Sequence, residues 1–198
     1  MKKEHIIPFL CLLIVLIVFA IGAINPVYRD DWLLESWLVI ISVPILVLTY
    51  KKFKFSNNSY ILIAIFFILH IIGSHYTYSE VPFGFWLSEL FNFSRNHYDR
   101  LLHLLWGILL YLPALEIYQK VSKSKTKFLF YYLMPASILI TLGVFYEVIE
   151  WLAAVIVAPE VGTAFLGTQG DQWDVYKDLF LKTIGSIAMS ILFYIKEK

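Results

Sequence analysis

The sequence predicts an all-α protein, a polytopic membrane bundle of six transmembrane helices with both termini in the cytoplasm. Of its 198 residues, 60% are hydrophobic and 16% are charged, against roughly 45–50% and about 25% in soluble domains. The mean hydropathy is +0.72. The apolar residues form blocks long enough to cross a hydrocarbon core, which takes about 20 helical residues. Such blocks must be helical, because lipid offers no partners to free backbone groups.

Six apolar segments define a single membrane domain over residues 1–198: 6–24, 33–50, 59–74, 101–118, 128–151 and 179–195. The first segment is longer than the 7–15 apolar residues typical of a signal peptide, so we expect a retained helix. Cys11 lies inside this segment and is the single cysteine of the chain, which excludes an intramolecular disulfide and leaves the redox compartment open.

The charged residues predict the orientation. Eleven of the sixteen basic residues lie on one side of the six segments: Lys2, Lys3, Lys51, Lys52, Lys54, Lys120, Lys123, Lys125, Lys127, Lys196 and Lys198. The positive-inside rule places this side in the cytoplasm. With 3 acidic residues there and 12 on the other side, the inner face is near +8 and the outer face near −7. The overall charge of +1, without a basic stripe, predicts no nucleic-acid partner.

Two long outer connections have room for chemistry. The connection that follows the third span, residues 75–100, is rich in aromatic residues between 82 and 93. This density predicts a short interfacial helix in the headgroup zone. The other connection, residues 158–178, carries three glycines and ends in a run of acidic residues.

Polar pairs at helical spacing mark the outer ends of three spans: Asp99 with His103, Glu147 with Glu150, and Asp174 with Asp178. Residues so spaced share a helix face. Glu147 lies 20 residues beyond Lys127, which is about 30 Å of helix or one hydrocarbon thickness. We therefore expect all three pairs at one membrane depth, next to His75 at the end of the third span.

Structural roles compete with a functional site at some of these positions. Asp99 fits a helix cap, and Asp174 and Asp178 stand at a helix N-terminus, where negative charge is stabilised. His103 alone is more typical of a hydrogen-bonded helix interface than of a ligand. We assign structural roles to two further ionisable residues within the spans: His70 and Glu116.

Glu147 and Glu150 do not fit a structural role as easily. They stand at a helix C-terminus, where the helix dipole disfavours anions, and they repel each other. Ionisable groups in spanning segments are costly and usually paired. Three kinds of compensation are open: a salt-bridge network with Arg95, Arg100 or Lys182, a shared proton, or a metal ion.

A mixed set of histidine and carboxylate groups suits Zn²⁺, Mn²⁺, Fe²⁺ or Mg²⁺, although no standard zinc motif such as H-E-x-x-H is present. The sequence therefore leaves the cofactor open and is compatible with a divalent metal ion. The candidate ligands are His75, Asp99, His103, Glu147, Glu150, Asp174 and Asp178.

Four motifs of the chain resemble the YjdF-type family of uncharacterised bacterial inner-membrane proteins: HYTYSEVPFG at 75–84, RNHYDRLLH at 95–103, YEVIEW at 146–151 and GDQWDVYKD at 170–178. They span about half of the chain. The resemblance implies a multi-pass protein of the bacterial inner membrane with an unassigned polar site, and it supplies no known reaction.

More distantly, the layout is similar to VanZ-like proteins, which are associated with glycopeptide resistance. Their pattern combines D-[KR]-x-x-H, E-x-x-Q and D-x-x-x-N-x-x-G at the ends of three helices. Glutamate replaces the glutamine and lysine replaces the asparagine here, and both departures change the local charge. The corresponding positions are Asp99-Arg100-x-x-His103, Glu147-x-x-Glu150 and Asp178-x-x-x-Lys182-x-x-Gly185.

The sequence is compatible with three functions. In a membrane-embedded enzyme acting on a lipid head group or an isoprenoid-linked precursor, Glu147 or Asp171 would be the general base, His103 an acid/base or ligand, and Arg100 a phosphate clamp. In a non-catalytic scaffold or envelope-stress factor, the polar cluster only ties helices together. A transporter fits less well, because carriers place polar groups near the midplane and often contain repeats.

Overall fold

The computed structural model describes residues 3–122, 128–157, 162 and 165–197. Within these residues it contains helices and no strand: η1 (Lys3–His5), α1 (Ile6–Gly22), α2 (Arg29–Thr49), α3 (Asn57–His75), α4 (Pro82–Phe91), α5 (Tyr98–Val121), α6 (Leu129–Ile156) and α8 (Asp174–Lys196). Six of these helices are long and apolar enough to cross a membrane. The predicted all-α class with six spans is confirmed, while the orientation stays a prediction.

Two helices begin well before the apolar segments that predicted them. α2 begins at Arg29 instead of residue 33, and α8 begins at Asp174 instead of residue 179. Both helices carry acidic residues in their first turn. Because a helix N-terminus stabilises negative charge, helical backbone extends into a polar stretch that hydropathy excludes. This extension makes Glu35 part of the second turn of α2.

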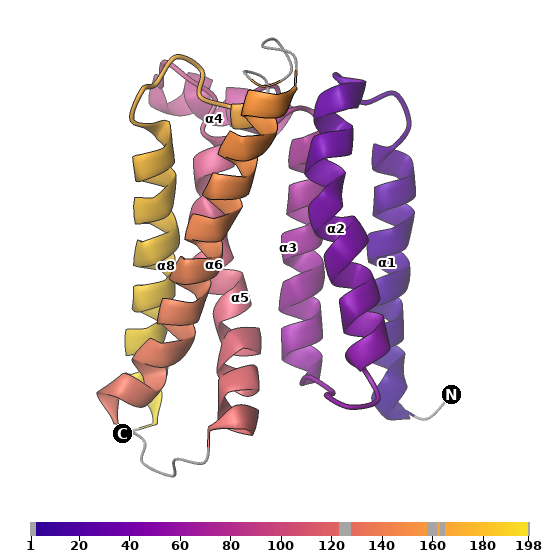
Figure 1. The fold of residues 1–198 in the computed structure, drawn as a ribbon, viewed down its shortest axis with the longest axis vertical. Helices are drawn as coiled ribbons and strands as arrows, with labels where there is room; N and C mark the ends of the chain where they lie inside the picture. The colour runs from indigo at the N-terminus through magenta and orange to yellow at the C-terminus, as the bar shows by residue number, and fades with distance from the viewer. Residues whose placement is uncertain (1–2, 123–127, 158–161, 163–164, 198) are drawn as a thin grey trace.

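The helices form two groups of three (Figure 1). One group contains α1, α2 and α3, and the other contains α5, α6 and α8, with α3 packed against α5 between them. Val39, Ile63 and Phe67 belong to the apolar core of the first group. Tyr111 and Tyr132 belong to a second core between α5, α6 and α8.

Two glycines let α5 and α8 approach closely. A Cβ atom on Gly107 would lie 2.2 Å from the backbone nitrogen of Ser186, and one on Gly185 would lie 2.4 Å from the carbonyl oxygen of Leu104. A side chain at either position would therefore separate the two helices. Residues four apart share a helix face. The polar residues of α5 and α8 that lie one and two turns from this contact therefore face each other.

The short helix α4 lies across the end of the bundle where α5 and α8 begin (Figure 1). Pro82 occupies its first turn, and Asn92 closes it in the left-handed conformation with φ 54°. Gly84 leaves room for the Asn96 side chain, whose oxygen would lie 1.7 Å from a Cβ atom there. The predicted short helix is thus present, and its place in the headgroup zone stays a prediction.

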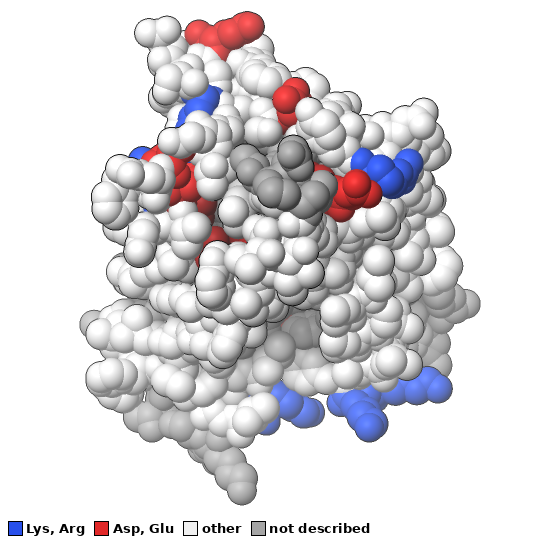
Figure 2. Space-filling view, turned by 45° about the horizontal axis from the view of Figure 1, so that its top comes forward, with Lys and Arg blue, Asp and Glu red and all other residues white. Residues whose placement is uncertain are grey.

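The two ends of the molecule differ in charge. Figure 2 shows acidic side chains, together with some basic ones, at the end that carries α4, and only basic side chains at the opposite end in this view. This distribution follows the charge asymmetry on which the predicted orientation rests.

Candidate functional site

Five charged side chains form an ion-pair network where α5 and α8 begin, and we call them the surface layer: Arg95, Arg100, Asp171, Asp174 and Lys177. Arg95 Nη1 lies 2.5 Å and Arg100 Nη2 lies 3.1 Å from Asp174 Oδ1. Asp171 pairs with Arg100 and accepts a hydrogen bond of 2.5 Å from Lys177 Nζ. Each carboxylate of this layer therefore has cationic partners.

Backbone contacts hold the surface layer in place. The side-chain amide of Gln169 bonds the backbone N–H and the carbonyl of Asn96, at 3.0 and 2.9 Å. Arg95 also donates to the Thr168 carbonyl at 3.3 Å. The hydrogen bond from Lys177, followed by that from the backbone of Trp173, holds the pKa of Asp171 well below its usual range. This carboxylate is built to stay ionised.

A second set of polar side chains gathers between α2, α5, α6 and α8, and we call it the deep layer: Glu35, Asp99, His103, Glu147, Glu150, Asp178 and Lys182. Lys182 donates to Glu147, and both side chains are buried, with 2% and 8% exposure. The ammonium group also lies 5.2 Å from the centre of the Tyr146 ring. Gly143 makes room for the lysine, since a Cβ atom there would lie 2.9 Å from Lys182 Cδ.

Three side chains of the deep layer converge in a way that suits a metal ion. His103 Nε2 lies 3.0 Å from Asp99 Oδ1 and 3.9 Å from Asp178 Oδ2. One ligand atom from each of the three residues lies within 4.8 Å of the other two. Asp178 is 3% exposed, and its Oδ1 atom has no hydrogen-bond partner among the described residues. A histidine and two carboxylates are a common ligand set for divalent transition metals.

Two small cavities adjoin these three residues. One of about 10 Å³ is bounded by Asp99, His103 and Asp178 together with Glu35, Glu147 and Glu150. Another of about 30 Å³ is bounded by Asp99, His103 and Lys182. A cavity of about 10–15 Å³ holds one water molecule. The deep layer therefore has room for an ion or for a few waters between its charged groups.

The charges of the deep layer do not balance. Five carboxylates, from Glu35, Asp99, Glu147, Glu150 and Asp178, face one lysine and one histidine. Even with a protonated histidine, three negative charges remain in surroundings that are largely removed from water. Such a concentration is too costly to persist without bound protons or a cation.

Glu35 is a site residue that sequence analysis missed. It is 2% exposed, and its carboxylate accepts a hydrogen bond of 3.1 Å from the Tyr146 hydroxyl. Its carbonyl oxygen lies 3.1 Å from His70 Nε2, and the other ring nitrogen of His70 lies 2.5 Å from the Tyr78 hydroxyl. The signal was the acidic i,i+4 pair Asp31 and Glu35 at the start of a span, because ionisable residues in spans are rare and usually functional.

Of the predicted metal ligands, Asp99, His103 and Asp178 come together, and Glu147 and Glu150 line the same cavity. Two others lie elsewhere. Asp174 belongs to the surface layer. His75 lies at the end of α3, where its Nδ1 atom is 2.9 Å from the Gly22 carbonyl oxygen.

The other predicted site residues also have clear positions. Arg100 and Asp171, predicted as phosphate clamp and general base, are bound to each other in the surface layer. Neither Asp99 nor Asp174 occupies an N-cap position, because His97 and Trp173 do. Glu116 accepts hydrogen bonds from Ser56 N and Ser59 Oγ, at 2.9 and 2.7 Å. This contact ties α5 to the start of α3, as expected for a structural role.

Comparisons with known proteins agree with the membrane fold. Residues 7–198 match a family described as "Predicted membrane protein (DUF2238)". Inner membrane protein YjdF of Escherichia coli (strain K12) is 35% identical over 160 residues, which cover 81% of this chain and 76% of that protein. No solved structure matches the chain.

These matches confirm the predicted YjdF-type resemblance and the predicted location in the bacterial inner membrane, while the likeness to VanZ-like proteins stays a prediction. With six helices able to span a bilayer, this is an integral, multi-pass membrane protein. The chain belongs to the DUF2238 family of membrane proteins.

Proposed function

We propose that this protein is a membrane-embedded enzyme that uses a divalent metal ion to hydrolyse a lipid-borne substrate. The observation that carries the proposal is the convergence of Asp99, His103 and Asp178 within 4.8 Å. Three protein ligands around a metal ion leave a coordination position for water, as in catalytic zinc sites. The unpartnered oxygen of Asp178 supplies one of the ligands.

The remaining carboxylates of the cavity supply acid–base chemistry. A divalent ion held there would lower the pKa of a water bound to it, and a nearby carboxylate could accept the proton of that water. Lys182 engages Glu147, so we assign the role of proton acceptor to Glu150, which lines the same cavity. Proton transfer to Glu150 also reduces the repulsion within the deep layer.

The substrate class follows from the position of the site. The deep layer lies near one end of the spanning helices, and Phe165, Leu166 and Gly167, which precede α8, line its smaller cavity. A lipid head group or an isoprenoid-linked envelope precursor reaches this depth from the bilayer. Arg95 and Arg100 are held by Asp171 and Asp174, so a phosphate would have to displace these carboxylates to bind them. We therefore place the reaction in the deep layer.

Metal content tests the proposal directly. The protein, purified in detergent and stripped with a chelator, is incubated with Zn²⁺ or Mn²⁺, passed through a desalting column and analysed for bound metal. We expect about one ion per chain for the wild type and for Asp30→Asn, a matched change at an exposed position. Asp178→Asn removes a ligand at nearly constant shape and should weaken binding by at least roughly tenfold, measured by repeating the incubation over a range of metal concentrations.

The combination with His103→Ala separates a site from independent contacts. Residues that act as one unit have non-additive effects, so the double variant should lose no more metal affinity than Asp178→Asn alone. The alternative is a non-catalytic scaffold, in which the deep layer only ties α5, α6 and α8 together. Two results together would favour the scaffold: the wild type binds no metal, and Asp178→Asn is more heat-stable than the wild type. In that case the substitution only relieves repulsion between carboxylates.

A further inference from the structure

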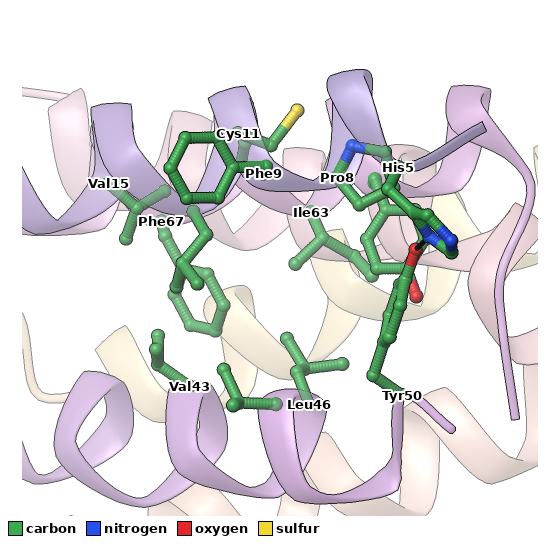
Figure 3. A pocket seen from close by; sticks show the side chains of 14 residues that line it. His5, Pro8, Phe9, Cys11, Val15, Val43, Leu46, Tyr50, Ile63 and Phe67 are labelled. Carbon is green, nitrogen blue, oxygen red and sulfur yellow. Dashed lines mark hydrogen bonds between the residues drawn. The ribbon is translucent and has the colours of Figure 1, made fainter. Parts of the chain in front are cut away.

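An apolar cavity of about 260 Å³ lies between α1, α2 and α3 (Figure 3). Its lining includes Tyr50, which follows the end of α2, whereas Glu35 of the deep layer lies in the second turn of that helix. The walls of the cavity are almost entirely hydrocarbon, and they include Phe9, Leu12, Val15, Val43, Leu46 and Phe67. Nothing in the candidate metal site uses this cavity. A role for this cavity is therefore independent of the proposed function.

The cavity has the depth of one bilayer leaflet. Its lining runs along α1 from His5 to Val15, ten residues that span about 15 Å of helix. Half of a hydrocarbon core of about 30 Å is the same length. The cavity therefore reaches from one end of the spanning helices to about the middle of the bilayer.

The mouth of the cavity is polar and basic. His5 Nδ1 lies 2.5 Å from the Tyr50 hydroxyl, and Figure 3 shows this pair at one end of the cavity. Lys51 and Lys52 follow directly in the sequence and are exposed. Lys54 Nζ lies 3.0 Å from Glu4 Oε2, whereas Lys51 and Lys52 form no ion pair within the described part of the chain. A phosphate group suits such a mouth, because lysine binds phosphate as a point charge.

The cavity is also open toward the membrane. Phe9 on α1 and Val47 on α2 both line it, and each is 50% exposed. A chain can therefore enter sideways from the lipid. A further helix, about 10–12 Å across with its side chains, is too large for the space between α1, α2 and α3.

We propose that this cavity binds one acyl chain of a phospholipid, with the phosphate of that lipid at Lys51 and Lys52. The apolar walls match the chain, the basic mouth matches the head group, and the depth matches one leaflet. The protein thereby holds a lipid at a fixed position between α1, α2 and α3.

A matched pair of leucines on α2 provides the test. Leu46 lines the cavity and is labelled among its walls in Figure 3, whereas Leu48 is 79% exposed and is not among the lining residues. Leu46→Trp fills the space, and Leu48→Trp makes the same change on the lipid-facing surface. Each purified protein is stripped of lipid with detergent, incubated with one equivalent of phosphatidylglycerol and analysed by native mass spectrometry.

We expect the wild type and Leu48→Trp to retain one phospholipid per chain and Leu46→Trp to lose at least roughly tenfold in affinity. Equal retention by the two variants, or a wild type that carries detergent alone, would overturn the proposal. Thermal unfolding establishes that each variant is folded. If Leu46→Trp unfolds early, Ala64→Leu fills the same cavity with a smaller change, and the same comparison applies to it.

Discussion

The surface layer and the deep layer contain the same kinds of side chain and differ in how their charges are balanced. In the surface layer, Asp171 and Asp174 face three cations. In the deep layer, five carboxylates face Lys182 and one histidine. In the surface layer, each carboxylate is paired with cations. The deep layer is left with an excess of negative charge, and this excess distinguishes a candidate site from a structural network.

The largest effect should come from Lys182→Met. The change leaves Glu147 buried without its cation, and removal of one partner of a buried ion pair typically destabilises by about 3–5 kcal/mol. Lys177→Met removes a cation from an exposed ion pair of the surface layer and should cost about 1 kcal/mol or less. Thermal unfolding in detergent measures both. Equal losses would show that the two layers do not differ as described.

The double variant Lys182→Met with Glu147→Gln sharpens this comparison. It removes the charge of Glu147 together with that of Lys182, so no unpaired buried carboxylate remains. The double variant should therefore recover part of the stability that Lys182→Met loses. A double variant less stable than Lys182→Met would show that the ion pair is not the source of the loss.

A smaller effect is expected from Gly107→Ala, which acts on the contact that aligns the deep layer. The new methyl group meets the backbone of α8 at 2.2 Å, so the helices must separate at a cost of about 1–3 kcal/mol. The separation also moves Asp99 and His103 away from Asp178, and metal binding should weaken. Gly22→Ala is the control, because its methyl group meets the Ile71 side chain at 2.8 Å, away from the deep layer, so metal binding should not change. Metal binding unchanged in Gly107→Ala would show that this contact does not align the ligands.

The smallest effect should be a change in the pH dependence of the surface layer. Contacts with Lys177 and the Trp173 backbone lower the pKa of Asp171 below its ordinary value of 3.8. A carboxyl group whose pKa is lowered by folding stabilises the folded state fully at pH values above its pKa in the unfolded chain. This stabilisation is lost as the pH falls below that value toward the pKa of the folded state. Between about pH 5 and pH 3, the thermal midpoint of the wild type should therefore fall more steeply than that of Asp171→Asn. Parallel curves would contradict the ion-pair role of Asp171.

The sequence predicted the six helices and the shared helix faces of the polar pairs, because both follow from local patterns, while the common membrane depth of the pairs stays a prediction. Hydropathy locates the spans, and i,i+4 spacing places Asp99 with His103 on one face of a helix. Lys182 was among the predicted compensators of Glu147, and the structure selects it over the two arginines. Arg95 lies just before α5 and Arg100 lies in its first turn, where both reach Asp171 and Asp174. Lys182 lies two turns inside α8.

Glu35 and the apolar cavity could not be placed from the sequence, because both depend on how separate helices dock. Spacing gives the face of a helix that a residue occupies, but not the helix that this face meets. Glu35 is a partner of Tyr146 only because α2 and α6 approach each other. The cavity depends on side-chain shapes from α1, α2 and α3 together, which no periodic pattern encodes.

The buried ion pair between Lys182 and Glu147 also bears on how the chain enters the bilayer. A lysine at the centre of a spanning helix costs about 2.5–3.5 kcal/mol to insert, and Lys182, two turns inside α8, bears part of that cost. Translation delivers α6 before α8, so the carboxylate is in place before its partner is synthesised. Insertion of α8 next to α6 neutralises both charges in one step, whereas insertion of α8 alone exposes the lysine to lipid. Insertion of α8 is therefore most favourable next to α6, which is already in the membrane.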